Sequence, residues 1–299
     1  MLSICIPVYN FEVYPLIKEL SQQSEDAEVS YEIIVLDDAS NDEFKIKNRD
    51  VKDISGVKYE ELDENIGRSR IRNLLNKMAS YPYLLFMDCD ALILNENFIS
   101  NYLAAINSLE KKDSLICGGR IYSIERPNDS KSLHWVWGNL REAFDAEKRC
   151  ENPYQSFMTN NFVVSKNVLN RIPFNEQLSG YGHEDTLLGF ELYKEKIPII
   201  HIDNPVEHIG LEEAEIILEK TNQSIINLLK IYEITNKDPD FVNISKLLKA
   251  YEKINKYGLR KFVVFLFKVF KKPVEKNLKS KSPSIRVFDL YKLGLICSV

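Results

Sequence analysis

The sequence has little of what would cross-link the chain or carry it through a membrane. Its five cysteines are an odd number among 299 residues and form no Cys-x-x-Cys pair, so neither a zinc ribbon nor a redox motif is indicated. The longest apolar run, residues 262–267, has six residues, whereas a membrane-spanning helix needs about 20. The first residues contain neither a positively charged stretch nor a small-residue cleavage site, which argues against a secretory signal. We therefore expect reduced thiols and a cytoplasmic protein.

What is present is an ordinary globular composition. Hydrophobic residues make up 44%, charged residues 28% and aromatic residues 11%. These proportions exclude a wholly disordered, collagen-like or disulfide-scaffold chain. The length leaves room for one large α/β domain or two modest ones.

The net charge of −5 conceals an asymmetry along the chain. Residues 241–299 carry 14 Lys and Arg against three Asp and Glu, a net charge of +11. The preceding residues carry 25 Lys and Arg against 41 Asp and Glu, a net charge of −16. This division suggests an acidic catalytic body and a basic tail that meets an anionic surface.

The order of apolar runs predicts a parallel sheet followed by helices. The opening reads as a βαβ unit, because two β-branched runs enclose a helical segment. The expected strands are residues 2–8, 31–36, 83–87, 115–124, 162–164 and 197–202. The expected helices between the first strands are residues 11–23, 67–79 and 97–109.

From residue 211 onward the pattern is mainly helical. We predict helices over residues 211–235, 243–257 and 259–272, with breaks at Asp238-Pro239 and Lys272-Pro273. The expected division is therefore an α/β domain over residues 1–210 and a basic helical extension over residues 211–299.

Acidic residues end two of the expected strands. In parallel sheets, ligands collect beyond the carboxyl ends of the strands. Asp37 and Asp38 follow the second strand and taken alone suit solvated turn formers as well as a site. Asp88 and Asp90 interrupt an apolar stretch, where an unpartnered charge is costly. Alternate residues of an extended segment point the same way, so these two carboxylates could converge on Mg²⁺ or Mn²⁺.

Five ordered segments resemble the family 2 glycosyltransferases of GT-A fold. The segments are residues 3–10, 34–40, 65–73, 85–90 and 174–192. The last contains Gly-Tyr-Gly-His-Glu-Asp at residues 180–185, similar to a Gly-x-Gly-x-Glu-Asp segment also found in galactosyltransferases. The resemblance covers about residues 1–210 and implies a Rossmann-like, mixed and mainly parallel central sheet flanked by helices.

The resemblance implies a UDP-sugar donor site. Pro7, Tyr9 and Asp38 would form its nucleotide end, with Tyr9 stacked on uracil and Asp38 accepting a hydrogen bond from the base. The alternative for Tyr9 is an aromatic ring packed on the following helix.

Three arginines lie near the start of the helix expected after Gly67. Arg68 and Arg72 share a helical face and Arg70 points elsewhere. One would reach the donor diphosphate, for which the family pattern favours Arg70 or Arg72, while the others make surface ion pairs.

By the same resemblance, Asp90 would bind Mn²⁺ or Mg²⁺, and Asp88 would contact the metal shell or donor hydroxyls. His208 matches the place where some relatives supply a third metal ligand, with His201 and His183 as alternatives. The metal would neutralise charge on the departing diphosphate.

Glu184 and Asp185 follow a glycine-containing loop at the expected start of a helix. They could simply complement the helix dipole. The resemblance instead makes Asp185 the general base for the acceptor hydroxyl and Glu184 an orienting group. Trp135 or Trp137 could shape the sugar site or pack in the core.

The basic tail carries a candidate membrane helix within residues 259–281. Lys261, Lys268 and Lys272 share one helical face. Alternatively, the helix packs on the catalytic body and leaves a solvated basic face. Nucleic acid is not an expected partner, because the body is acidic and no recognition motif is present.

Together these features predict an inverting, metal-dependent glycosyltransferase. It would move a sugar from a UDP-sugar to a glycan or lipid-linked acceptor in bacterial surface polysaccharide synthesis, at the inner face of the cell membrane. Two alternatives are a catalytically idle nucleotide-sugar-binding or membrane scaffold protein, and a sugar nucleotidylyltransferase. The sequence lacks the glycine-rich, lysine-containing phosphate loop of sugar nucleotidylyltransferases, which argues against the second alternative.

Overall fold

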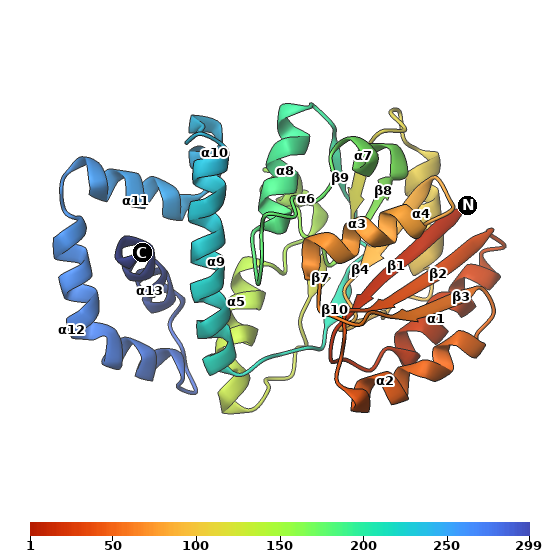
Figure 1. Cartoon of the computed structure of the whole chain (residues 1–299), viewed down its shortest axis with the longest axis horizontal. Helices are drawn as coiled ribbons and strands as arrows, with labels where there is room; N and C mark the ends of the chain where they lie inside the picture. The colour runs from red at the N-terminus through yellow and green to blue at the C-terminus, as the bar shows by residue number, and fades with distance from the viewer. The chain divides into compact units, whose positions relative to one another are not determined.

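A seven-stranded sheet forms the centre of the first part of the chain in the computed structural model, which describes all 299 residues (Figure 1). Its strands in spatial order are β3 (Val57–Glu61), β2 (Tyr31–Asp37), β1 (Leu2–Val8), β4 (Tyr83–Met87), β8 (Asn161–Ser165), β6 (Leu115–Cys117) and β9 (Ile199–His201). All neighbours pair in parallel except β8, which is antiparallel to β4 and β6. The predicted α/β class with a mixed, mainly parallel sheet is confirmed.

Helices cover both faces of this sheet, because successive strand residues alternate between two apolar layers. Ile4 and Ile6 face one core, which includes α1 (Tyr14–Asp26) and α4 (Phe98–Asn107). Cys5 and Phe86 face the other, which includes α3 (Arg68–Met78), α7 (Lys166–Arg171) and α8 (Glu184–Lys194). The remaining helices here are α2 (Asp42–Asn48), η1 (Arg49–Asp53) and α6 (Ala146–Cys150).

A second, three-stranded sheet extends beyond the carboxyl edge of the first. It contains β5 (Ala91–Leu92), β10 (Val206–His208) and β7 (Arg120–Ile121) in that order. These strands follow β4, β9 and β6 along the chain, so the small sheet joins the segments that leave three main strands.

The strand predicted over residues 115–124 is interrupted at Gly118 and Gly119, and this part of the prediction is wrong. A Cβ on Gly118 would lie 2.3 Å from the hydroxyl oxygen of Tyr102. Gly119 has a φ of +93°, a left-handed conformation that favours glycine. The two glycines therefore let the chain leave β6 and enter β7, which carries Arg120.

The chain forms two units. The first comprises Met1–Ser123, Glu142–Ser179 and Glu184–Gly210, and contains both sheets. The second comprises Ile124–Arg141, Gly180–His183 and Leu211–Val299.

The second unit is helical. Its helices are η2 (Asp129–Lys131), α5 (Ser132–Arg141), α9 (Ala214–Ile234), α10 (Pro239–Ile244), α11 (Lys246–Lys256), α12 (Arg260–Leu278) and α13 (Ile285–Ser298). Within this unit, α13 contacts α9, α11 and α12 (Figure 1). None of the helices is long and apolar enough to cross a membrane.

The predicted helix end at Lys272 is wrong, because α12 continues through Pro273 to Leu278. A proline removes the hydrogen bond to the carbonyl of the residue four positions earlier, here Val269. Pro273 and Val269 are both exposed, so water can satisfy that carbonyl. The helix therefore tolerates the proline at its surface.

Candidate active site

Three neighbouring parallel strands end beside one another in the main sheet. β2, β1 and β4 are adjacent and end at Asp37, Val8 and Met87. The residues that follow β2 and β4, among them Asp38 and Asp88, therefore lie at one carboxyl edge. Ligands of parallel sheets bind at such an edge.

Asp38 fixes the start of α3 at this edge. Its Oδ1 accepts a hydrogen bond from the backbone N–H of Ile66 at 2.7 Å, and its Oδ2 accepts one from Gly67 at 3.0 Å. Burial raises the pKa of Asp38 above its usual value, although both hydrogen bonds act in the opposite direction. Each oxygen retains a second lone pair that can accept a ligand N–H.

Pro7 and Tyr9 lie at the end of β1. Pro7 is half-buried, whereas Tyr9 is 54% exposed. A ring this exposed is not buried against the following helix, so its aromatic face is accessible to a ligand.

Arg68 and Arg72, one helical turn apart on α3, hold two carboxylates. Arg72 is 2% exposed, donates to Oδ1 of Asp88 at 3.0 Å and lies 3.5 Å from Oε1 of Glu184. Arg68 donates to the same Glu184 oxygen at 3.3 Å. Burial acts to raise the pKa of Glu184, but the charges of the two arginines lower it below its usual value. Glu184 is thereby held as a carboxylate.

Arg70 is not part of this cluster. Its side chain is 59% exposed and lies 3.8 Å from Glu176. The i, i+2 spacing turns it away from the face that Arg68 and Arg72 share.

Asp88 has a second arginine partner that the sequence analysis missed. Arg120 donates to Oδ2 of Asp88 at 3.2 Å and to Glu142 at 3.1 Å. The hydroxyl of Tyr122 also donates to Glu142. A signal for Arg120 was available, because it is a charge within an otherwise apolar run, as Asp88 is.

Asp90 and His208 form a separate pair across the small sheet. Oδ1 of Asp90 lies 3.2 Å from Nδ1 of His208, and the backbone N–H of Ile209 donates to the Asp90 carbonyl at 3.0 Å. Burial acts to raise the pKa of Asp90, but the hydrogen bond to His208 and the nearby positive charges lower it below its usual value. Gly210 packs against this carboxylate, because a Cβ there would lie 2.4 Å from Oδ2 of Asp90.

The carboxylate oxygen of Asp90 and the imidazole nitrogen of His208, 3.2 Å apart, could supply two of the ligands of Mn²⁺ or Mg²⁺. The chain contains no group of three His, Cys, Asp or Glu side chains with metal-binding geometry. Asp88 does not join Asp90 and His208, since its oxygens face Arg72 and Arg120. A metal held by the pair needs further ligands from a bound substrate.

Asp185 is the second residue of α8. It is partly exposed, and its Oδ1 accepts a hydrogen bond from the backbone N–H of Thr186 at 2.6 Å. Burial and the neighbouring charge of Glu184 raise the pKa of Asp185 to about 7. A carboxyl group with this pKa can take up and release a proton near neutral pH.

The other candidates have different positions. His201 is buried, with Nδ1 3.0 Å from Arg149 and Nε2 2.9 Å from the Pro153 carbonyl, so both ring nitrogens are engaged within the protein. His183, Trp135 and Trp137 belong to the second unit.

A known protein family matches the part of the chain that runs from β1 to α7. The pattern described as "Glycosyl transferase family 2" matches residues 3–174, more than half of the chain. The chain belongs to this family.

Two curated relatives are large polymer-forming enzymes. The chain is 24% identical over 224 residues to a chondroitin synthase of Escherichia coli, a match that covers 65% of this chain and 32% of the relative. It is 25% identical over 201 residues to a teichoic acid poly(glycerol phosphate) polymerase of Staphylococcus epidermidis, covering 65% and 26%. The chain thus spans about a third or less of these relatives.

Solved structures share the fold. The mannosyltransferase PcManGT of Pyrobaculum calidifontis, in complex with GDP-Man and Mn²⁺, aligns with a TM-score of 0.59 at 15% identity and covers 99% of this chain and 85% of its own. S. aureus TarS 1–349, in complex with UDP-GlcNAc, aligns with a TM-score of 0.51 at 19% identity over 97% and 89%.

Proposed function

We propose that this glycosyltransferase moves a sugar from a UDP-sugar to an acceptor hydroxyl with inversion, and that residues 1–210 perform the chemistry. The observation that carries the proposal is the carboxyl of Asp185, partly exposed and with a pKa of about 7. Its neighbour Glu184 lies 3.5 Å from Arg72, which also donates to Asp88, so this arginine connects the base to the donor edge.

The nucleotide would bind at the ends of β1 and β2. The exposed ring of Tyr9 offers a stacking surface next to Pro7, and Asp38 can accept the N–H of uracil. The complex of TarS with UDP-GlcNAc supports UDP as the nucleotide. PcManGT binds GDP-Man, so a guanine donor is the competing outcome of a donor screen.

Of the arginines on α3, Arg68 is best placed for the donor diphosphate. Its side chain is 42% exposed and donates to Glu184, to which Arg72 also lies close. Its charge also lowers the pKa of Asp90, so it lies within electrostatic reach of that residue. Arg72 is buried and acts by positioning Asp88, and Arg70 faces Glu176.

Asp90 and His208 would hold Mn²⁺ or Mg²⁺, with donor phosphate oxygens completing the ligand set. When bound, the ion supplies the charge neutralisation that helps the nucleoside diphosphate depart. Asp88, fixed by Arg72 and Arg120, would accept hydrogen bonds from ribose or sugar hydroxyls.

Asp185 would take the proton of the acceptor hydroxyl. As that oxygen bonds to the anomeric carbon, the bond from this carbon to the UDP oxygen breaks and UDP leaves. A single base opposite the leaving group is what inversion requires. Glu184, kept ionised by Arg68 and Arg72, would orient the sugar.

The acceptor would be a glycan or a lipid-linked glycan of bacterial surface polysaccharide synthesis. The matches to a chondroitin synthase and a teichoic acid polymerase support this class of acceptor.

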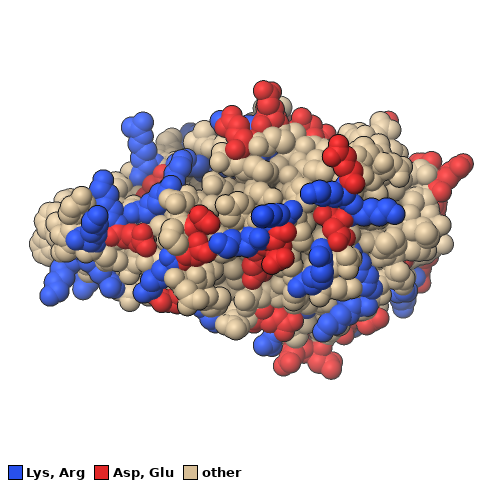
Figure 2. All heavy atoms as spheres, turned by 90° about the horizontal axis from the view of Figure 1, so that it is seen from above, with Lys and Arg blue, Asp and Glu red and all other residues tan.

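The helical extension, residues 211–299, would hold the enzyme at the anionic inner face of the membrane through residues 259–281. In α12, Phe267 packs on Tyr291 of α13 with ring centroids 5.6 Å apart. Five apolar side chains on its outer side are exposed: Phe262, Phe265, Leu266, Val269 and Phe270. Helical spacing places Lys261, Lys268, Lys272 and Lys276 along one border of this surface. Figure 2 shows Lys and Arg side chains among uncharged surface at the left of the view, where α11, α12 and α13 lie.

Such a helix binds anionic bilayers through both its apolar and its basic side chains. Co-sedimentation with phosphatidylglycerol-containing vesicles tests this, against vesicles of phosphatidylcholine alone. We expect at least about tenfold weaker binding when three exposed phenylalanines of α12 are changed to Ser. The variant carries Phe262→Ser, Phe265→Ser and Phe270→Ser. A matched control changes three exposed apolar residues outside α12: Ile216→Ser, Ile226→Ser and Leu290→Ser. Equal losses in both variants would contradict the proposal.

Release of nucleotide from a panel of donors tests the transferase itself. UDP-Gal, UDP-GalNAc, UDP-Glc, UDP-GlcNAc and GDP-Man would be incubated with Mn²⁺, with and without glycan acceptors. UDP release that requires Mn²⁺ or Mg²⁺ is the expected result. UDP binding without turnover of any donor would identify an idle binding protein instead.

A further inference from the structure

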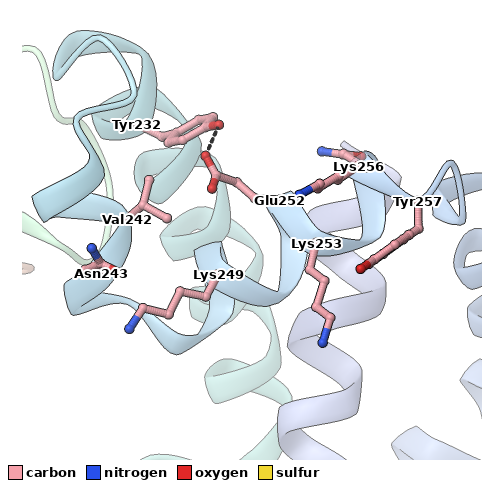
Figure 3. Close-up of a pocket in the computed structure, with 9 residues that line it drawn as sticks. Tyr232, Val242, Asn243, Lys249, Glu252, Lys253, Lys256 and Tyr257 are labelled. Carbon is pink, nitrogen blue, oxygen red and sulfur yellow. Dashed lines mark hydrogen bonds between the residues drawn. The ribbon is translucent and has the colours of Figure 1, made fainter.

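The second unit contains a cavity whose lining includes none of the residues assigned to catalysis. It has a volume of about 630 Å³, is open to solvent, and is lined by parts of α9, α10 and α11 (Figure 3). Its lining residues are Tyr232, Val242, Asn243, Lys249, Glu252, Lys253, Asn255, Lys256 and Tyr257. We refer to it as the α11 groove.

Three lysines of the groove belong to one row on α11. Lys246, Lys249, Lys253 and Lys256 are spaced three, four and three residues apart, so they share a helical face. Figure 3 shows Lys249 and Lys253 projecting on the same side of the helix. All four are exposed, and no carboxylate lies within 4.0 Å of any of their ammonium groups. At 1.5 Å rise per residue, successive charges stand about 4.5 to 6 Å apart along the helix axis.

The single acid of the lining does not neutralise this row. Oε1 of Glu252 accepts a hydrogen bond from the Tyr232 hydroxyl at 2.8 Å, drawn as the dashed line in Figure 3. Burial and this bond raise the pKa of Tyr232 to about 12, so Tyr232 remains a donor to Glu252 at neutral pH. The lining therefore keeps an excess of two positive charges.

The uncharged lining residues suit a carbohydrate. Tyr257 is 63% exposed and presents an aromatic face, against which sugar C–H groups pack. Asn243 and Asn255 are exposed amides that can both donate and accept hydrogen bonds to hydroxyls. The one aliphatic residue of the lining, Val242, is buried.

We propose that the α11 groove binds an anionic glycan, a sugar chain with carboxylate or phosphate groups repeated along its length. A row of separated, unpaired ammonium groups matches repeated charges better than a single phosphate. A lipid bilayer fits the groove less well, because the lining contains no exposed aliphatic side chain that could enter it. If the proposed transferase function holds, the bound chain is the acceptor.

Direct binding to the full-length protein tests the proposal. The probes are fluorescently labelled unsulfated chondroitin and poly(glycerol phosphate), with dextran of similar length as the neutral control, all without donor or metal. We expect both anionic probes to bind, dextran to bind weakly, and affinity to fall with added salt.

The groove variant carries Lys249→Gln, Lys253→Gln and Lys256→Gln. It should bind the anionic probes about tenfold more weakly, because it loses three exposed ion pairs. A charge-matched control in the first unit carries Lys18→Gln, Lys52→Gln and Lys77→Gln, three exposed lysines, and should bind like the wild type. Tyr257→Ala should weaken binding to chondroitin in the wild-type background.

Three outcomes would overturn the proposal: unchanged affinity in the groove variant, equal losses in both lysine variants, or binding of anionic vesicles but of neither glycan through the groove lysines. Because binding is measured without turnover, a protein that binds the glycan but releases no UDP would refute the transferase function and leave the groove assignment standing.

Discussion

Replacing Asp185 with Asn tests the assigned base and also makes a prediction about stability. Asn has nearly the same shape and keeps an oxygen for the Thr186 N–H, but it cannot accept the acceptor proton. Loss of a general base reduces the rate by about 10²–10⁴-fold. Donor binding should be retained, because Asp185 does not belong to the nucleotide or metal residues. In the wild type, the rate of transfer should rise as pH increases through about 7, where Asp185 loses its proton.

The same variant should be more stable than the wild type at alkaline pH. A rise of the Asp185 pKa from 3.8 to about 7 means that ionising this carboxyl lowers the free energy of unfolding by at most about 4 kcal/mol. Solvent reduces this to about 1–2 kcal/mol, since Asp185 is partly exposed. A carboxyl group with a raised pKa binds more protons in the folded than in the unfolded protein. The contribution of Asp185 to the wild-type free energy of unfolding therefore falls as the pH rises from about 4 to about 7. Asn avoids this fall.

Thermal melting at pH 4 and pH 8, together with UDP release and calorimetric UDP binding, gives the required comparison. We expect the variant to melt about 2–8 °C above the wild type at pH 8 and close to it at pH 4. Full transfer by the variant would exclude Asp185 as the base. Equal melting temperatures at pH 8 would show that the ionised carboxyl is not destabilised by its surroundings.

Four further substitutions test the supporting residues. Gly210→Ala should weaken Mn²⁺ affinity in the presence of UDP by about 10–100-fold, because its Cβ would displace the Asp90 carboxylate; unchanged affinity in calorimetry would refute this. Arg72→Met should lower the free energy of unfolding by about 3 kcal/mol, because Asp88 and the buried Glu184 each lose one of their two arginine partners, whereas Arg70→Met should change it by less than about 0.5 kcal/mol. Urea unfolding measures both, and similar effects would contradict the buried role. His208→Ala should raise the Mn²⁺ concentration needed for UDP release at least about tenfold, and an unchanged metal dependence would remove this ligand.

The main sheet could be predicted from sequence because its strands have strong local signals. The runs that became β1 and β4 are apolar, end at polar residues and alternate with helical segments. The edge strand β3 was not predicted, since Val57 and Tyr59 are only partly buried and alternate with exposed residues. Its place in the sheet comes from pairing with β2, which local sequence does not reveal.

Helical spacing also predicted that Arg68 and Arg72 share a face, which the structure shows. Their partners could not be predicted in the same way. Glu184 comes from a segment more than a hundred residues away, and its position depends on how α8 packs on the sheet. Arg120 reaches Asp88 only because the chain turns at two glycines between β6 and β7. Long-range packing therefore decides which charges meet.

The small sheet couples Asp90 and His208, the proposed ion-binding pair, to Arg120, the arginine that positions Asp88. β5, β10 and β7 are two or three residues long and are hydrogen-bonded to one another, with Asp90 just before β5, His208 ending β10 and Arg120 beginning β7. Opening strand pairs as short as these costs less free energy than opening a seven-stranded sheet. Mild denaturant should therefore abolish the proposed metal binding while the main sheet is still folded. Amide exchange in these strands should then increase before any global unfolding is seen.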